Sequence, residues 1–401
     1  MTSELLGLRD RLAPDHGLGI LPAWLRDLPV EAVRDTPLIL CGYDPVLSPL
    51  QVYMLLLQGF RIRHFADDTK QGETIGKKEF LNSFQLCQLP QLKESILINC
   101  ATHNQRHYRN YEALAKAMDL RMLNIHQLAF YLRRVGQINL RTTIDSSYFV
   151  TSVIEKLEDY LAIDGAFEDD ESRRVWHGIL MGRLTADMGH FQNVYTDVSE
   201  MYFPGCFKYQ LDEILVDAGA CDGADTVRYL RKHHHQLNAA YLYEISSENR
   251  AAIRTNLEQF NGLGLSTKLH VREKGLWHRA ETLQFTGESL YAILDEKIET
   301  PNHATESRPT EVIDLDSDLE SATLIKLEIE GAEQNALEGA ERILREGKPK
   351  LAVSLYHQSD DILTVLRFLT KLDLGYRYRL SHHWGSEIRT LLYCATEFAD
   401  G

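Results

Sequence analysis

The stretch Ile214-Leu-Val-Asp-Ala-Gly-Ala-Cys-Asp-Gly-Ala-Asp-Thr226 decides the fold of the C-terminal half of this chain. Its apolar start predicts a short buried strand, and Gly219 and Gly223 predict a turn that leads into a helix over residues 225–232. Glycines let the backbone approach a ligand closely, and the first turn of a helix carries free N–H groups. The stretch therefore predicts a nucleotide-binding corner.

The acid at Asp217 distinguishes this corner from one that binds a dinucleotide. The usual dinucleotide fingerprint is G-x-G-x-x-G, without an acid two residues before its first glycine. A carboxylate at that place repels a pyrophosphate but suits a ligand that carries an ammonium and a sulfonium, as S-adenosylmethionine (SAM) does. SAM is the favoured ligand. Another nucleotide and a purely structural glycine turn are the alternatives.

The chain is strongly acidic. Its 401 residues contain 43 Lys and Arg against 58 Asp and Glu, which gives a formal net charge of −15. The length allows two or three domains. The charge disfavours non-specific binding to nucleic acid or to an anionic membrane, which requires a basic surface. We interpret the basic run from Arg228 to His235 as a solvated helix face, and we do not favour metal binding at its three histidines.

Cysteine spacing and the absence of long apolar runs indicate the compartment. The six cysteines are dispersed, with no C-x-x-C pair, so a zinc cluster or a disulfide scaffold is not expected. Residues 1–20 lack a basic segment followed by an apolar core, and no apolar run approaches the ~20 residues of a membrane span. We expect a cytoplasmic protein with no membrane association.

The N-terminal half predicts a smaller α/β domain. Residues 1–35 form a leader, and residues 36–130 alternate strands and helices, which implies a parallel, Rossmann-like sheet. The first turn of this domain, Cys41-Gly-Tyr-Asp-Pro45, has one glycine where a phosphate cradle usually has three, so a structural role is favoured over cofactor binding. Residues 131–210 predict a helical connector. We expect this half to position an acceptor rather than perform chemistry.

Residues 211–401 predict the second α/β domain. Its two last strands are close in sequence, which suits an antiparallel pair. Five parallel strands followed by an antiparallel hairpin is the layout of Rossmann-like class I SAM methyltransferases. The expected strands cover 213–217, 240–244, 268–272, 323–329, 349–356, 376–380 and 389–394, and one helix is expected over 333–345.

Glu244 completes the predicted donor site. It ends the second strand of this domain, 27 residues after Asp217, where an acid can accept both hydroxyls of an adenosine ribose. A surface salt bridge is the alternative. The predicted cofactor-binding residues are Asp217, Gly219, Ala220, Asp222, Gly223 and Glu244.

Charged residues end the fourth and fifth strands. Because side chains alternate along a strand, Lys326, Glu328 and Glu330 share one face, and His357 ends the next strand at the same edge. Ligands of open α/β sheets bind beyond these carboxyl ends. His357 is the candidate general base, and His383 on the closing hairpin is the second candidate. A buried ion network with Lys326 is the alternative interpretation of the two acids.

The C-terminal half resembles the FkbM family of SAM-dependent methyltransferases. Two departures stand out: Glu328 lies where the family usually has Asp, and Ile245 lies where a Pro often follows the ribose acid. Residues 36–200 resemble the accessory region of a bacterial branch of the family. The motifs that carry the resemblance are Tyr202-Phe-Pro204, Asp217-Ala-Gly-Ala-Cys-Asp-Gly223, Glu244 with Asn256, Leu324-Ile-Lys-Leu-Glu-Ile-Glu-Gly-Ala-Glu333, Pro349 to His357 and His383 to Tyr393.

The resemblance implies transfer of a methyl group from SAM to a hydroxyl of a sugar, a glycan or a secondary metabolite. Such a hydroxyl needs a base or a metal to deprotonate it. Glu328 and Glu330 could orient His357, contact the acceptor or hold a divalent cation such as Mg²⁺, but we do not favour metal dependence and assign no metal ligand.

The expected partner is a small-molecule or glycan acceptor, and a homo-oligomer is compatible with the sequence. Two rival functions remain. One is a nicotinamide-dependent sugar oxidoreductase that holds its cofactor in the first α/β domain. The other is a SAM-binding scaffold without catalytic activity.

Overall fold

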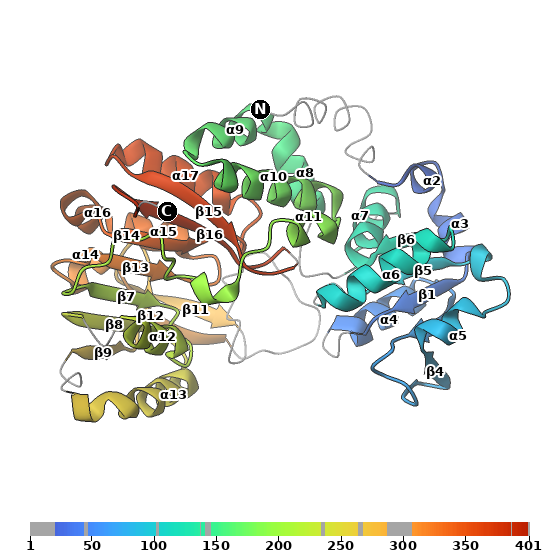
Figure 1. The fold of residues 1–401 in the computed structure, drawn as a ribbon, viewed down its shortest axis with the longest axis horizontal. Helices are drawn as coiled ribbons and strands as arrows, with labels where there is room; N and C mark the ends of the chain where they lie inside the picture. Colours follow the sequence, from blue (N-terminus) through green and yellow to red (C-terminus); the bar gives the residue numbers. More distant parts are fainter. Residues whose placement is uncertain are drawn as a thin grey trace. The chain divides into compact units, whose positions relative to one another are not determined.

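The chain folds into two compact units, coloured from blue to red along the sequence in Figure 1. The structure is a computed structural model, and it describes residues 21–43, 47–101, 104–136, 138–140, 146–233, 237–263, 268–286, 307–385 and 387–399. Unit 1 comprises Met1–Leu161, Arg174–Tyr195 and Trp384–Ile388, and unit 2 comprises Ala162–Arg173, Thr196–His383 and Arg389–Gly401. Residues 1–20 of the expected leader lie outside the described residues, and the domain boundaries expected from the sequence stay predictions.

Unit 1 contains a six-stranded sheet in the order β3-β4-β2-β1-β5-β6. All of its pairs are parallel except β3 with β4, and the hairpin that these two form was not expected from the sequence. The strands β1 and β5 are wholly buried because every residue in them is apolar except the last of β5. The strands are β1 Leu38–Cys41, β2 Ile62–Ala66, β3 Thr74–Ile75, β4 Lys78–Leu81, β5 Ile96–Asn99 and β6 Arg121–Asn124.

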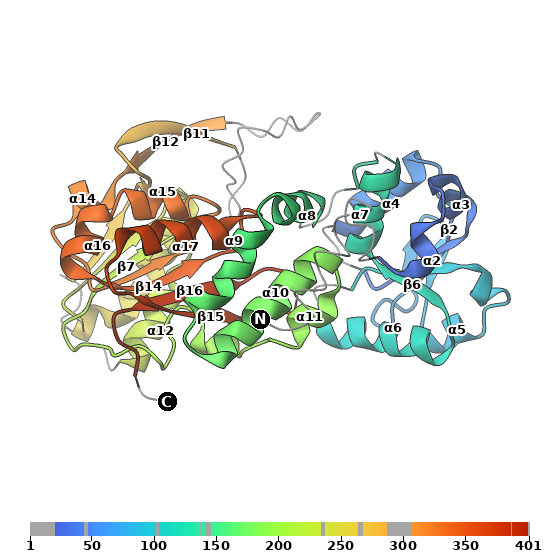
Figure 2. The same cartoon turned by 90° about the horizontal axis from the view of Figure 1, so that it is seen from above.

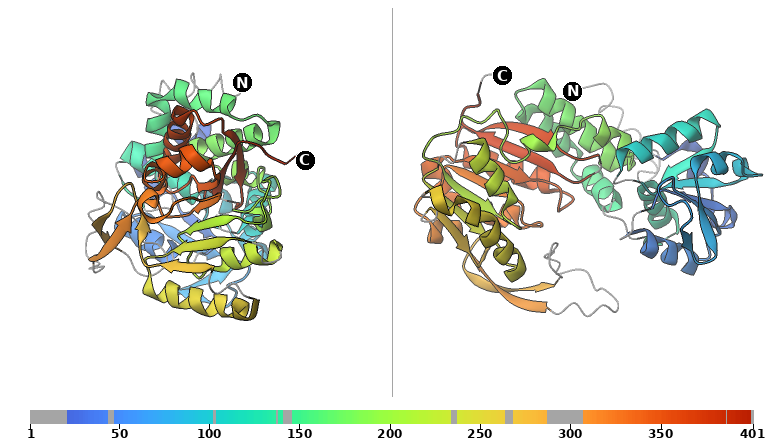
Figure 3. Two further views of the ribbon diagram at one scale, coloured as in Figure 1. Left: turned by 90° about the vertical axis from the view of Figure 1, so that its left-hand side faces the viewer. Right: turned by 60° about the horizontal axis from the view of Figure 1, so that its bottom comes forward.

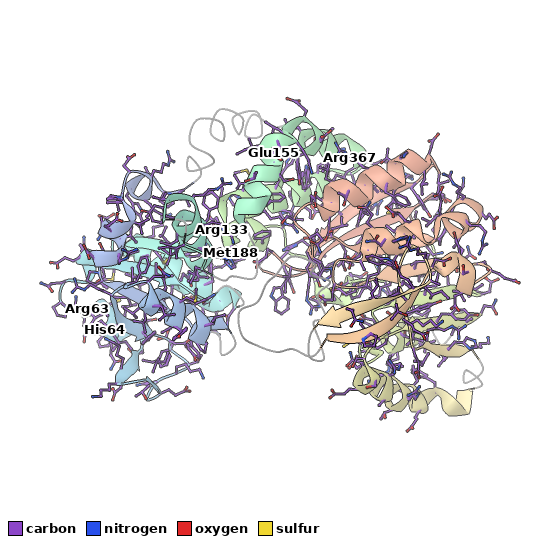
Figure 4. All side chains as sticks on the ribbon, turned by 180° about the vertical axis from the view of Figure 1, so that it is seen from behind. Arg63, His64, Arg133, Glu155, Met188 and Arg367 are labelled. Atoms are coloured by element: carbon purple, nitrogen blue, oxygen red, sulfur yellow. The ribbon has the colours of Figure 1, made fainter. Side chains whose placement is uncertain are left out.

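Helices cover this sheet and continue beyond it in sequence. In the view from behind, the labels Arg63 and His64 mark β2 (Figure 4). The described residues of the predicted helical connector, 131–210, are mostly helical, as the sequence predicts. The helices up to residue 200 are α2 Ala23–Arg26, α3 Val30–Asp35, α4 Leu47–Leu57, α5 Ser83–Cys87, η2 Leu92–Glu94, α6 Gln105–Ala117, α7 Ile125–Gly136, α8 Ser146–Glu155, α9 Leu157–Ala162, η3 Ile163–Ala166, α10 Asp170–Thr185, α11 Met188–Gln192 and η4 Val198–Glu200.

Unit 2 contains a seven-stranded sheet in the order β15-β16-β14-β13-β7-β8-β9. Its first five strands in sequence are parallel, and β16 pairs antiparallel with both β14 and β15. The predicted fold class, with a parallel sheet and a closing antiparallel hairpin, is confirmed. The strands are β7 Ile214–Ala218, β8 Ala239–Tyr243, β9 Leu269–Arg272, β13 Leu324–Leu327, β14 Lys350–Ser354, β15 Arg377–His382 and β16 Thr390–Ala395.

Helices pack on both faces of this sheet. Figure 2 shows α17, α15 and α16 along one face and α12 along the other, and Figure 3 gives two further views. This is the consequence of right-handed crossovers that run in opposite directions from the central pair β7 and β13. The carboxyl ends of β7 and β13 therefore meet at one edge. The helices are α12 Ala224–Lys232, α13 Ser247–Leu257, η5 Glu258–Leu263, α14 Leu315–Asp318, α15 Glu333–Glu338, α16 Glu341–Gly347 and α17 Asp361–Leu372.

The single helix expected over 333–345 is wrong, because the structure breaks it into α15 and α16 around Gly339. A Cβ on Gly339 would lie 2.1 Å from the carbonyl oxygen of Trp277, so the backbone of another segment occupies that side of the break. The break also frees backbone N–H groups of Arg342 and Ile343, and the carboxylate of Asp316 accepts both, at 2.7 and 2.9 Å. The apolar residues of the two helices and the break are buried: Ala336, Leu337, Ala340, Ile343 and Leu344.

A second, three-stranded sheet in unit 2 was not expected from the sequence. Its order is β10-β12-β11, with β11 antiparallel to β12 and β10 parallel to it. The three strands are β10 Gly275–Leu276, β11 Glu281–Thr286 and β12 Ser307–Ile313. Among the described helices of the whole chain, none is both long and apolar enough to span a bilayer.

Candidate active site

The glycine turn after β7 lies against the end of β13. Gly219 has a φ of +71°, and a Cβ there would lie 1.8 Å from the carbonyl oxygen of Glu328. Only glycine tolerates both the left-handed conformation and this close approach. Gly223, with a φ of +78°, is the N-cap residue of α12. The turn predicted from sequence is therefore present, and it touches the strand end that carries the predicted catalytic acids.

Asp217 is fully buried beneath this turn. Its Oδ1 lies 2.9 Å from Nζ of Lys326, and its Oδ2 accepts a hydrogen bond of 2.6 Å from the hydroxyl of Thr226. Both carboxylate oxygens thus hold protein groups together, and a lysine neutralises the charge that we expected to face a cationic ligand. The direct contact of Asp217 with the donor stays a prediction; the observed contacts order the turn.

Glu244 ties the glycine turn to the loop after β8. One carboxylate oxygen accepts from the backbone N–H of Cys221 at 2.9 Å, and the other accepts from that of Ser246 at 2.7 Å. Each oxygen of an ionised carboxylate has capacity for a further hydrogen bond. Glu244 is therefore placed at the turn and retains acceptors for a ribose diol, which fits the adenosine portion of SAM.

The remaining predicted donor-site residues lie in the same turn. The N–H of Ala220 donates to the carbonyl of Tyr243, and the side chain of Asp222 accepts from the N–H of Ala224 at 3.0 Å. Asp222 is exposed. Its carbonyl accepts from the side chain of Asn256 at 2.8 Å, so the turn is also fixed to α13.

Glu328 is an anion held by three hydroxyl groups beyond the end of β13. The phenol of Tyr202 donates to it at 2.7 Å, and the hydroxyls of Ser354 and Tyr356 also donate to it. Its side chain is 17 % exposed. Burial alone raises the pKa of a carboxyl, but His357, Lys326 and the hydroxyl of Ser354 lower the pKa of Glu328 to about 2.

His357 lies among three carboxylates. Its Nδ1 is 2.8 Å from Oε1 of Glu333, and its Nε2 is 3.6 Å from both Glu328 and Glu330. Burial alone lowers the pKa of an imidazole, but Glu333 and Glu328 raise the pKa of His357 well above its ordinary value. The ring is therefore an imidazolium at neutral pH. A free general base needs a vacant nitrogen lone pair, which the free protein does not offer at His357.

Glu330 lies in a strained turn at the mouth of this cluster. It has a φ of +56°, and the next residue, Gly331, has a φ of +102°. Burial, helped by Glu328 and Glu333, raises the pKa of Glu330 to about 7, although His357 opposes this rise. Because of this pKa, the carboxyl of Glu330 exchanges a proton near neutral pH, as a general base must. Its side chain is 26 % exposed.

Glu330→Gln is expected to stabilise the folded protein above pH 7. A pKa raised from the ordinary 4.5 to about 7 means that the folded state holds the proton more tightly than the unfolded chain. This contribution is complete below pH 4.5 and is lost as the pH rises toward 7, so the ionised group strains the fold. At pH 8 the free energy of unfolding of Glu330→Gln is expected to exceed that of the parent protein by roughly 1–3 kcal/mol. Thermal melts at pH 5 and pH 8 test this, and a variant less stable than its parent at pH 8 would contradict it.

His383 is not brought to this cluster. It is fully buried, its Nδ1 lies 3.0 Å from the carbonyl oxygen of Asp197, and its Nε2 lies 2.9 Å from the hydroxyl of Tyr393. Both ring nitrogens are thus engaged inside the protein. His383 directly follows β15, and the last residue of that strand, His382, is also buried. The predicted catalytic role of His383 finds no support in this geometry.

Glu333, His357 and Asp361 are close enough to hold a metal ion, since one ligand atom from each lies within 4.8 Å of the others. In the structure the two carboxylates instead accept hydrogen bonds from backbone N–H groups. Glu333 accepts from the backbone N–H groups of Ile329 and Gly331, at 2.8 and 3.0 Å, and Asp361 accepts from that of Gln358 at 2.7 Å. Metal-independent activity stays a prediction, and methyl transfer after exhaustive chelation is its test.

The basic run on α12 lines a groove of about 710 Å³ with α13. None of the residues that line it belongs to the acid cluster, which consists of Glu328, Glu330, Glu333 and His357. Arg231 donates to Gln259 at 2.6 Å, and Lys232 donates to the carbonyl of Phe203 at 2.8 Å. Both side chains are exposed, which agrees with the predicted solvated helix face. His234 and His235 lie outside the described residues.

The first turn of unit 1 is filled by the protein itself. A Cβ on Gly42 would lie 2.5 Å from that of Ala101, and the N–H of Tyr43 donates to the carboxylate of Asp67 at 2.9 Å. A phosphate would need that N–H and that space. The observation favours the structural role predicted for this turn over a nicotinamide site, and Asp44 and Pro45 lie outside the described residues.

Comparison with known proteins identifies unit 2. Residues 217–378 match the family model described as the methyltransferase FkbM domain. They are an FkbM methyltransferase domain. The matched range begins at Asp217 and covers the glycine turn, Glu244, the acid cluster and His357. The family implies SAM as the methyl donor of this domain. Among curated proteins, no sequence matches the chain.

Several solved structures resemble the chain. Methyltransferase FkbM from Methylobacillus flagellatus KT is 20 % identical, with a TM-score of 0.79 over 98 % of both chains, so the fold of the whole chain is shared. An rRNA methylase from Streptococcus thermophilus is 18 % identical over 47 % of this chain and 88 % of that chain, with a TM-score of 0.27. A precorrin-6y C5,15-methyltransferase from Geobacter metallireducens GS-15 is 12 % identical over 46 % and 80 %, with a TM-score of 0.29.

Sequence reasoning missed three residues that belong to the acid cluster or contact it. Glu333 was not among the predicted site residues, yet it contacts His357. Tyr202 and Ser354 were not predicted to bind Glu328. Ser354 could have been found, because it ends β14 beside the end of β13, but nothing in the spacing of Tyr202 places it there.

Proposed function

We propose that the FkbM domain transfers a methyl group from SAM to a hydroxyl group of a sugar, a glycan or a secondary metabolite. The observation that carries the proposal is the pair of carboxylates, Glu328 and Glu330, that lie 3.6 Å from Nε2 of His357, at the strand end that touches the glycine turn. An amine acceptor has a lone pair ready to attack, whereas a hydroxyl needs a base to take its proton.

The residues of the acid cluster suit a hydroxylated acceptor. Glu328 accepts hydrogen bonds from three hydroxyl groups of the protein, so its carboxylate is largely occupied, whereas the carboxylate of Glu330 is 26 % exposed and can accept hydrogen bonds from a hydroxylated molecule. Displacement at a methyl carbon with a good leaving group depends mainly on positioning. These features support a carbohydrate-like acceptor.

In the proposed reaction SAM supplies an electrophilic methyl group. Glu330, ionised above its pKa, takes the proton of the acceptor hydroxyl while the oxygen forms its bond to the methyl carbon and the carbon–sulfur bond breaks. The imidazolium of His357 lies between Glu328 and Glu330 and holds both carboxylates in place. We thus move the role of base from His357 to Glu330 and keep His357 as an orienting cation.

The decisive experiment incubates the full-length protein with isotope-labelled SAM and a panel of hydroxylated acceptors. Binding of SAM by calorimetry and a product that gains one labelled methyl group by mass spectrometry would support the proposal. A methyl ether survives mild alkali and a methyl ester does not, so this treatment distinguishes a hydroxyl acceptor from a carboxylate acceptor. Tight binding of NAD without binding of SAM would instead revive the oxidoreductase.

A further inference from the structure

Lys326 is a buried ammonium in the middle of the seven-stranded sheet. Its side chain is 1 % exposed, and it lies on β13 between β7 and β14. Burial disfavours an ammonium, but Asp217, Asp225 and Glu328 raise the pKa of Lys326 above its usual value. The group is therefore charged at every pH at which the protein would be assayed.

The ammonium joins three parts of the predicted donor site. Nζ lies 2.9 Å from Oδ1 of Asp217 at the end of β7 and 3.6 Å from Oδ2 of Asp225 in the first turn of α12. It also donates a hydrogen bond of 2.8 Å to the carbonyl oxygen of Gly219. The strand before the turn, the turn itself and the helix after it are thus held by one side chain from a neighbouring strand.

We propose that Lys326 is a positioning residue that holds the glycine turn in its donor-binding conformation through the carbonyl of Gly219. This inference rests on the proposed function, since it assumes that SAM binds at this turn. Lys326 is buried and does not contact the donor itself. Its effect passes through the orientation of the peptide plane after Gly219. Gly219 has a φ of +71° and no side chain that could hold this peptide plane instead.

A competing account makes Lys326 only a counterion for Asp217. Removing one partner of a buried ion pair is strongly destabilising, whereas removing both charges is often tolerated. The carbonyl of Gly219 separates the two accounts, because it is a neutral acceptor that charge compensation does not require. If the counterion role were complete, removal of both charges would restore the site.

The experiment compares full-length Lys326→Met/Asp217→Asn with full-length Asp217→Asn and with the parent protein, because Asp217 is itself a predicted donor-site residue and accepts a hydrogen bond from Thr226. Thermal melts establish that the double variant is folded, and calorimetry with S-adenosylhomocysteine measures the donor site without turnover. We expect a folded double variant whose affinity is weaker by roughly 10–150-fold, as for loss of a hydrogen bond to a charged group. Parental affinity in the folded double variant would overturn the proposal in favour of the counterion account.

Lys326→Arg keeps the test decisive if the double variant does not fold. It preserves the charge, but a planar guanidinium presents its donors in a different geometry from an ammonium. Weaker binding of S-adenosylhomocysteine at an unchanged melting temperature supports the positioning role, and unchanged affinity overturns it. Failure of the parent protein to bind S-adenosylhomocysteine would count against the proposed function itself, so the two failures are distinguishable.

Discussion

Glu330→Gln is expected to slow methyl transfer by about 10²–10⁴-fold, the usual contribution of a general base. Glutamine has the same shape and cannot accept the hydroxyl proton, so donor affinity should be unchanged. Steady-state rates at saturating SAM, together with calorimetry of donor binding, measure the two effects separately. The expected outcome is therefore a loss in kcat with an unchanged affinity for SAM.

Glu338→Gln is the matched control for this variant. Glu338 is an exposed acid on α15 of the same domain, and it accepts a hydrogen bond of 3.0 Å from Gln334. Its replacement makes the same chemical change away from the acid cluster, so parental rates are expected. If Glu330→Gln turned over as fast as this control, the base would lie elsewhere and the assignment of Glu330 would fail.

The pH dependence of the parent enzyme follows from the same group. The base form of Glu330 is the carboxylate, so kcat/KM should fall about tenfold per pH unit below pH 7 and level off above it. Glu328, Glu333 and His357 face this carboxyl, and the observed midpoint belongs to the coupled cluster. The acidic limb of the profile should disappear in Glu330→Gln.

Glu244→Ala is expected to weaken SAM binding by roughly 10–150-fold, because a charged acceptor is worth about 1.5–3 kcal/mol. The side chain holds the N–H groups of Cys221 and Ser246 and has capacity left for the ribose hydroxyls. Truncation should therefore affect binding of the donor before any chemical step. Calorimetry with SAM on the folded variant measures the effect.

Glu248→Ala is the control for this second variant. Glu248 is an exposed acid in the first turn of α13, four residues after Glu244, and none of the described contacts joins it to the glycine turn. Its removal should leave SAM affinity unchanged. Equal affinities for the two variants would show that Glu244 does not bind the ribose.

Much of the fold could be predicted because its signals are local. Apolar runs such as Ile214 to Val216 and Leu351 to Val353 mark buried strands wherever they occur. The split at Gly339 could not be predicted, since the helical periodicity continues through it and the groups that meet the break, the carbonyl of Trp277 and the carboxylate of Asp316, come from other segments. The sheet formed by β10, β11 and β12 was missed for a similar reason: its pairing joins segments that are distant in sequence.

In the candidate site, too, the features with local sequence signals could be predicted and the contacts between distant segments could not. The alternation of residues along a strand placed Glu328 beside the carboxyl end of the sheet, and the spacing of Gly219 and Gly223 predicted the turn. Sequence reasoning could not predict which of the charged side chains contact one another. Lys326 lies 107 residues after Gly219 in the sequence, and it reaches Gly219 and Asp217 only because β7 pairs with β13.

By itself the sequence determined the elements, the order in which they occur and the identity of the charged groups at the sheet edge. Only the tertiary structure decided which of those groups meet, how deeply each is buried and therefore which proton each one holds. Periodicity fixes the direction of a side chain relative to its own strand. The electrostatic state of His357 or Glu330 depends instead on carboxylates that strand pairing and a left-handed turn bring within 3.6 Å.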